Sequence, residues 1–184
     1  MTEAVVIGAS AGALEALSVI LPGLPADFPV PIMVVVHMPH DKKSVMAELL
    51  QGKCRVKVRE AEDKEPIRSG TVYVAPPDYH LQVEMTRSLS LSGDEPVLYS
   101  RPSVNVLFES AADAYGPGLV AIVLTGANQD GADGMKAVAD AGGQGIVQRP
   151  EEAFAPAMPE AALAACPDAR VLSLEEIATW LKTV

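Results

Sequence analysis

The chain has 184 residues, of which 49% are hydrophobic and 21% are charged, a balance typical of one globular domain rather than a disordered chain. The formal net charge of −10 disfavours nucleic-acid binding, which requires clustered Lys and Arg side chains to contact phosphates. The sequence contains neither a signal-peptide pattern nor an apolar run of about 18 residues, so we expect no membrane insertion.

The two cysteines, Cys54 and Cys166, do not form a Cys-x-x-Cys pair and give no disulfide framework. This favours a reducing, cytoplasmic location. We expect no cofactor and no bound metal.

The first third of the chain alternates short apolar runs with segments of helical spacing. The run at residues 4–8 ends in glycine and is followed by apolar residues spaced three and four apart, which predicts a strand, a tight turn and a helix. After it we expect a strand at 31–36, a turn at 37–41, a helix at 42–50 and a short strand at 55–58.

The middle of the chain, residues 70–92, has no helical pattern. Apolar residues alternate with polar ones there, and turn signals occur at Pro76-Pro77-Asp78 and Gly93-Asp94. We therefore expect antiparallel strands that are inserted into a parallel sheet or attached at its edge.

The last part of the chain returns to alternating helices and strands, which predicts a doubly wound α/β fold. We expect a mainly parallel sheet with helices on both faces, an antiparallel hairpin section in the middle of the chain, and a single domain over residues 1–184. The elements expected here are helices at 103–114, 134–141, 158–165 and 174–181, with Ser103 as a candidate N-cap, and strands at 119–124 and 145–148.

Reactive side chains follow three of the strongly apolar strands. Ser10 follows the first strand, His37 directly ends the second, and Asp130 lies in the loop after the third. Ligands of open parallel sheets bind outside the carboxyl ends of the strands. If these three strands are neighbours, the three side chains converge at one edge of the sheet.

These residue types suit nucleophilic catalysis. A serine hydroxyl needs a base to remove its proton, and the imidazole of His37 can be that base for Ser10. Asp130 can orient the imidazole and stabilise its protonated form. The sequence thus predicts a catalytic triad of Ser10, His37 and Asp130.

The turn around the candidate nucleophile is rich in glycine. We expect Gly8 and Gly12 to permit the tight strand-to-helix turn that presents Ser10. The helix start also offers free backbone N–H groups, and the N–H of Ala11 is a candidate donor to an oxyanion.

Each of these residues has a simpler explanation when it is taken alone. A glycine-flanked serine is often only a turn that starts a helix, a histidine can end a strand, and Asp130 before Gly131 can be an N-cap. The joint occurrence of all three at strand ends favours catalysis.

Three rival functions remain open. The first is dinucleotide binding, although Ser10 and Ala13 replace two glycines of that fingerprint and the second strand lacks a terminal acid. The second is a metal hydrolase, for which His37, His40 and Asp41 offer ligands and His80 is the third histidine, expected at the surface or rim. The third is a related α/β domain with a diverged or non-catalytic binding role.

Five segments resemble the chemotaxis-receptor protein-glutamate methylesterase family, the CheB-type catalytic domain. The segments occur in family order between residues 6 and 163, so the resemblance covers nearly the whole chain. They are VIGASAGALEAL, HMP, RPSVNVLFESAA, LTGANQDGADGMKA and MPEAAL.

The resemblance implies an enzyme that hydrolyses glutamate γ-methyl esters on the cytoplasmic helices of methylated chemoreceptors. The family often also deamidates receptor glutamines, and Ser10, His37 and Asp130 match its triad positions. Family members commonly carry an N-terminal receiver domain, which is not seen in this chain. A separate response-regulator or signalling protein is therefore a candidate partner.

The chain departs from the family pattern near the expected site. Ala11 stands where the family usually has threonine, Ala127 replaces a methionine, and Asn128 replaces a glycine. Side-chain contributions near the oxyanion or substrate are expected to differ, whereas backbone N–H donors are retained.

Overall fold

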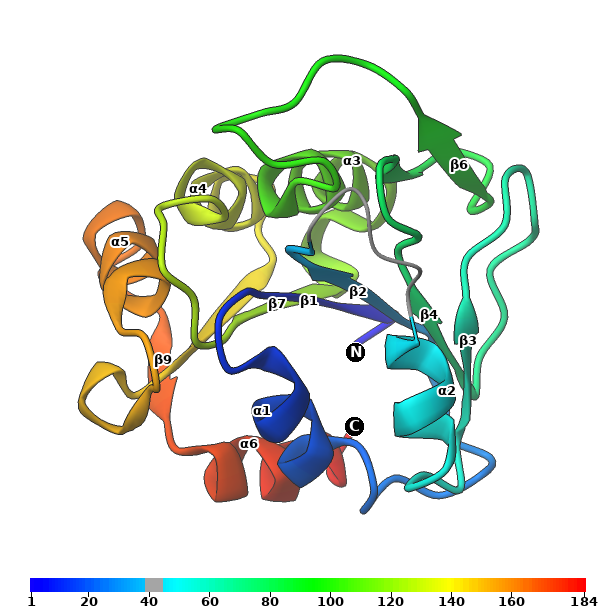
Figure 1. Ribbon diagram of the computed structural model, residues 1–184, viewed down its shortest axis with the longest axis horizontal. Coiled ribbons are helices and arrows are strands. Elements are labelled where there is room, and N and C mark those ends of the chain that lie inside the picture. The colour runs from blue at the N-terminus through cyan, green and yellow to red at the C-terminus, as the bar shows by residue number, and fades with distance from the viewer. Residues whose placement is uncertain (39–44) are drawn as a thin grey trace.

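A computed structural model describes residues 1–38 and 45–184. Its centre is a seven-stranded sheet with the strand order β3-β4-β2-β1-β7-β8-β9, in which neighbouring strands run parallel (Figure 1). β1 lies in the middle and pairs with β2 and β7, so the three strands that precede the reactive residues are neighbours. The strands are β1 (Ala4–Ala9), β2 (Ile32–Val36), β3 (Lys57–Glu60), β4 (Thr71–Val74), β7 (Leu119–Val123), β8 (Gln144–Gln148) and β9 (Arg170–Leu172).

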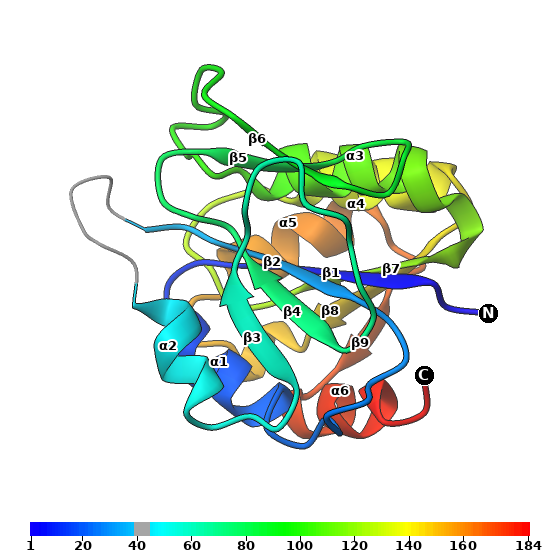
Figure 2. The ribbon, with the colours of Figure 1, turned by 90° about the vertical axis from the view of Figure 1, so that its right-hand side faces the viewer.

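Helices cover both faces of this sheet, as Figures 1 and 2 show from two directions. One face carries α1 (Ala13–Ile20), α2 (Met46–Gln51) and α6 (Leu174–Leu181). The opposite face carries α3 (Val104–Tyr115), α4 (Ala132–Asp140) and α5 (Ala157–Ala165). Two short 3₁₀ helices, η1 (Gly116–Gly118) and η2 (Pro150–Glu152), precede β7 and follow β8.

The alternation of side chains along β1 divides the core into two layers. Val5 and Ile7 join the apolar cluster under α1 and α6, whereas Ala4 and Val6 join the cluster under α3. Burial on both faces explains why the central strands read as continuous apolar runs instead of alternating ones.

The predicted fold class is confirmed, with differences in detail. The segment at 71–74 was expected to be antiparallel, but β4 pairs in parallel with both β2 and β3. Only β5 (His80–Val83) and β6 (Leu89–Ser92) form the antiparallel hairpin, a separate two-stranded sheet. The hairpin is tied to α3 by a hydrogen bond from the N–H of Val83 to the hydroxyl of Ser110.

Smaller differences concern element bounds. β3 begins two residues later than expected, and β9 was not predicted because two of its three residues are exposed and it gives no apolar run. The described part of the expected helix at 42–50 starts at Met46, and residues 39–44 lie outside the described residues. Among the described helices, none combines the length and the apolar character that crossing a bilayer requires.

Gly8 allows the start of α3 to lie directly on β1. A Cβ atom built at Gly8 would lie 2.3 Å from Cγ1 and 2.8 Å from Cγ2 of Val104, which is fully buried. The expectation that Gly8 serves the strand-to-helix turn was wrong, since Gly8 lies within β1. Gly12 has that role, because its φ of 84° is in the left-handed region.

We predict that Gly8→Ala lowers the free energy of unfolding by about 1–3 kcal/mol. Alanine is ordinarily better than glycine inside a strand, but the stiff, buried side chain of Val104 has no room to move away. Urea unfolding should be compared with that of Gly93→Ala, where the added Cβ meets nothing within 4 Å. Equal stability of Gly8→Ala and the wild type would contradict this packing.

Candidate active site

The sheet register sets Ser10 beside His37. Ala9 and Val36 are partners in the parallel β1–β2 ladder, and the next residue of each strand is Ser10 and His37 respectively. The N–H of His37 donates to the carbonyl of Ala9 at 3.1 Å, so the ladder continues to this point. If the alternation of the two strands continues by one residue, both side chains are directed to the face that carries α3 and α4.

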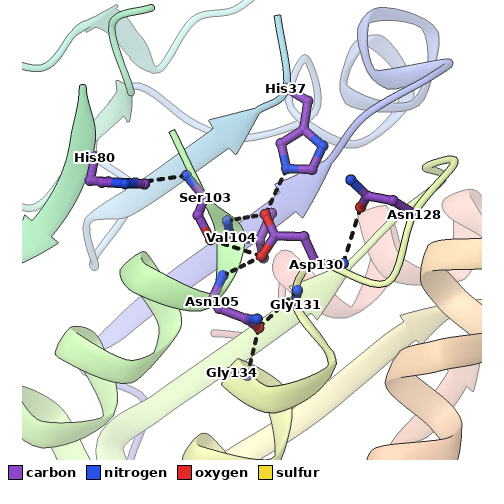
Figure 3. Close-up of polar contacts among 9 residues, drawn as sticks. All are labelled: His37, His80, Ser103, Val104, Asn105, Asn128, Asp130, Gly131 and Gly134. Atoms are coloured by element: carbon purple, nitrogen blue, oxygen red, sulfur yellow. Dashed lines mark hydrogen bonds and ion pairs between the residues drawn. The ribbon is translucent and has the colours of Figure 1, made fainter. Parts of the chain in front are cut away.

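Asp130 comes to the same place from the other neighbour of β1. The ladder between β1 and β7 continues past its last pair, because the N–H of Ser10 donates to the carbonyl of Thr125 at 2.9 Å. The loop that follows brings Asp130 Oδ2 to 2.6 Å from Nε2 of His37 (Figure 3). The structure thus brings Asp130 into contact with His37 and sets the backbone of Ser10 beside that of His37.

The contact with Asp130 fixes the roles of the two imidazole nitrogens. An ionised carboxylate only accepts hydrogen bonds, so Nε2 of His37 carries the proton in this contact. In the neutral ring Nδ1 is then the unprotonated nitrogen, free to accept a proton. The side chain of His37 is 12% exposed and that of Asp130 is fully buried.

The carboxylate of Asp130 also caps helix α3. Oδ2 accepts from the N–H of Val104 at 2.7 Å, and Oδ1 accepts from the N–H of Asn105 at 2.9 Å and from the hydroxyl of Ser103 at 2.8 Å (Figure 3). Ser103 occupies the N-cap position, as expected, but its hydroxyl makes no capping bond to its own helix. The cap of α3 is supplied by a residue 26 positions further along the chain.

The side chain of Asn105 caps helix α4. Its Oδ1 accepts from the N–H of Gly131 at 2.9 Å and from the N–H of Gly134 at 2.8 Å. The two helix starts therefore cap each other, Asp130 serving α3 and Asn105 serving α4. A Cβ at Gly134 would lie 2.7 Å from Cβ of Phe108, so glycine is also what allows the two helices to approach.

These contacts keep Asp130 ionised although it is buried. Burial by itself raises the pKa of the carboxyl, but hydrogen bonds from His37 and from the N–H groups of Asn105 and Val104 lower it, and its pKa ends below the ordinary value. The side chain of Asn128, one of the departures from the family pattern, accepts from the N–H of Asp130 at 3.0 Å and holds the loop locally.

Thr125 supports the turn that follows Ser10 and was missed in the sequence. Its hydroxyl donates to the carbonyl of Ala11 at 2.8 Å and accepts from the N–H of Ala155 at 2.9 Å. Gln148 fixes Thr125 in turn by accepting its N–H at 2.9 Å. The available signal was a polar residue at the end of a buried strand, the same signal that identified His37.

The position expected for His80 was wrong. It was expected at the surface or rim, but only 2% of it is exposed, and its ring contacts Ser103 behind Asp130. The error arose because its neighbours in sequence are turn residues, whereas β5 faces α3. His40 and Asp41, the other candidate metal ligands, lie outside the described residues, and within the described part of the chain no His, Cys, Asp and Glu side chains cluster as a metal site.

We predict that Asp130→Asn lowers the free energy of unfolding at pH 7 by about 1–3 kcal/mol, because an amide cannot accept all four hydrogen bonds. The depressed pKa means that this stabilisation is present above the unfolded-state pKa of about 3.9 and is lost as the pH falls through the folded-state value. Denaturant unfolding from pH 7 to pH 3 should therefore show the difference between the two proteins shrinking. Asp133→Asn, an exposed carboxylate on α4, is the matched control, and a difference that is constant with pH would contradict the assignment.

Known proteins with similar sequences or structures point to one family. Residues 5–181 match the family described as CheB methylesterase. The putative protein-glutamate methylesterase/protein-glutamine glutaminase of Leptospira interrogans is 47% identical over 176 residues, which cover 96% of this chain and 91% of that protein. The corresponding protein of Archaeoglobus fulgidus is 41% identical over 162 residues, covering 86% of this chain but 46% of that protein.

The fold gives the same result. The crystal structure of the Thermotoga maritima CheB methylesterase catalytic domain superposes with a TM-score of 0.94 at 33% sequence identity, covering 100% of both chains. The nucleotide-binding and metal-hydrolase alternatives receive no support from these relatives. The match over nearly the whole chain, together with relatives above 40% identity, shows that the chain belongs to the CheB methylesterase family.

Proposed function

We propose that this chain is a serine hydrolase that removes methyl groups from glutamate γ-methyl esters, with Ser10 as nucleophile, His37 as general base and Asp130 as the residue that orients the base. The observation that carries the proposal is the 2.6 Å contact between His37 and Asp130 at the position where the sheet register sets Ser10. If His37 and Asp130 only stabilised the fold, no serine would be needed at the position beside His37.

The first half of the reaction follows from the hydrogen-bond roles. Because Nε2 of His37 donates to Asp130, the unprotonated Nδ1 is the atom that takes the proton from the Ser10 hydroxyl. The serine oxygen then attacks the ester carbonyl, and the tetrahedral intermediate collapses with departure of methanol, which receives the proton back from His37. Asp130 stabilises the imidazolium that forms between these two proton transfers.

The oxyanion of the intermediate requires N–H donors. Among the described residues, no acceptor contacts the N–H of Ala11, the residue after the nucleophile, so this N–H is a free donor at the turn. Thr125 fixes the neighbouring peptide group by binding the carbonyl of Ala11. Replacement of the family's threonine by Ala11 leaves this backbone donor in place.

The second half of the reaction releases the glutamate. Water loses a proton to His37 and attacks the acyl-enzyme, which restores Ser10 and leaves a free γ-carboxylate. The same sequence with a γ-amide in place of the ester would release ammonia and convert glutamine to glutamate. The names of the Leptospira and Archaeoglobus relatives include both activities.

The proposed partners are the cytoplasmic helices of methylated chemoreceptors, and the proposed location is the cytoplasm. Two free cysteines, Cys54 and Cys166, are consistent with a reducing compartment. We further propose that residues 1–184 act as one catalytic domain and that a response-regulator or signalling protein is a further partner.

The proposed nucleophile is tested with Ser10→Ala. We expect methanol release from a methylated receptor fragment to fall by about 10³-fold or more, with residual turnover from oxyanion stabilisation alone. Ser18→Ala, on the partly exposed side of α1, is the matched control and should retain the wild-type rate. Circular dichroism checks that both variants fold, and a folded Ser10→Ala protein with wild-type turnover would overturn the proposal.

The proposed base is tested by the pH profile. A general base must be unprotonated to act, so kcat/KM of the wild type should decline toward acidic pH. In His37→Gln the small remaining rate should lose this decline. Ester hydrolysis measured from pH 5 to 9 makes the comparison, and an unchanged acid limb in the variant would mean that another group is the base.

A further inference from the structure

His80 is a buried histidine that the catalytic proposal does not use. Its Nδ1 accepts the N–H of Ser103 at 3.2 Å, and its Nε2 bonds the carbonyl oxygen of Glu95 at 2.9 Å. A backbone N–H only donates and a carbonyl only accepts, so the two contacts require a neutral ring with its proton on Nε2. A proton on Nδ1 would face the N–H of Ser103, so that two hydrogen-bond donors would lie opposite each other.

Ser103 connects His80 to the candidate active site. Its N–H is held by His80 while its hydroxyl donates to Oδ1 of Asp130 at 2.8 Å, and Oδ2 of the same carboxylate contacts His37 (Figure 3). Ser103 is fully buried, so neither of its bonds is shared with bulk water. The series His80, Ser103, Asp130, His37 therefore runs through consecutive hydrogen bonds from the β5–β6 hairpin to the proposed base.

We infer that His80 is a positioning residue for the hydrolysis: by holding the backbone of Ser103 it sets the direction in which Asp130 faces His37. This inference rests on the proposed function. His80 reaches Asp130 only through Ser103 and makes no contact with His37, so its proposed role is indirect (Figure 3). Its loss should change turnover rather than substrate binding.

The contacts of His80 argue against a role in the hairpin alone. The pairing of β5 with β6 is made by backbone groups, including those of the His80–Ser92 pair, and does not need the imidazole. Both bonds of the ring reach outside the two strands, to Glu95 and to Ser103. The connection between hairpin and α3 is separately anchored by Arg101, which bonds Asp78 and the carbonyl of Gly93.

Three substitutions separate the two bonds of the ring. His80→Asn places an amide oxygen at the same number of bonds from Cα as Nδ1 and can still accept the N–H of Ser103. His80→Gln places its amide nitrogen in the position of Nε2, which keeps the donor to Glu95 but removes the acceptor. His80→Leu has nearly the shape of Asn and neither function, so Asn and Leu form a matched pair.

We expect kcat for ester hydrolysis to fall about tenfold in His80→Leu and His80→Gln, the effect of one lost hydrogen bond. KM should remain unchanged, and His80→Asn should keep most of the wild-type kcat. Thermal unfolding of each variant shows whether it is folded. If the three variants lose kcat equally, or if the loss appears in KM, His80 acts through packing and the inference is overturned.

A second measurement does not depend on activity. The NMR signal of the His37 ring proton shared with Asp130 should shift in His80→Leu and His80→Gln but stay near its wild-type position in His80→Asn. An unmoved signal in all variants would overturn the positioning role. If the wild type shows no Ser10-dependent hydrolysis while the signal behaves as expected, the proposed function fails. The positioning of Asp130 by His80 through Ser103 would still hold.

Discussion

The carboxylate of Asp130 is the group on which the arrangement of this protein depends. It accepts two backbone N–H groups at the start of α3, one hydroxyl from Ser103, and the ring proton of His37. An uncompensated buried charge would be strongly destabilising, whereas four donors satisfy this one completely. Asn105 makes the complementary bonds to the start of α4, so the two helices are fixed against each other at the edge of the sheet where Ser10 and His37 end their strands.

This arrangement links folding to the proposed chemistry. The bonds that hold the pKa of Asp130 low are the bonds that attach α3 to the sheet, so an ionised carboxylate is available to His37 whenever the helix is in place. The close approach of Val104 to Gly8 also fixes the helix, because this tight packing allows the start of α3 to lie in one position against β1. The orientation of the proposed base is therefore maintained by groups that pack against the core of the fold.

The sequence predicted the parts of this site that depend on strand order and strand ends. Ser10, His37 and Asp130 could be found because each follows a long apolar run, and runs of that kind are the central strands of a parallel sheet. Ser103, Asn105 and His80 could not be assigned their contacts, because their partners lie 15 to 29 residues away and are set by how α3 packs beside α4 and β5. For the same reason the sequence indicated strands at 70–92 but did not distinguish the parallel β4 from the antiparallel hairpin, since short half-apolar runs suit either pairing.

The most direct test of the account is labelling with a serine-directed fluorophosphonate, followed by peptide mapping. If Asp130 both caps α3 and orients His37 toward Ser10, the wild-type protein should be labelled at Ser10 alone. The labelling rate should fall at least about tenfold in folded Asp130→Asn, because the base is no longer held in the tautomer that accepts the serine proton. A label on another residue, no label at all, or an Asp130→Asn protein that reacts as fast as the wild type would contradict the account.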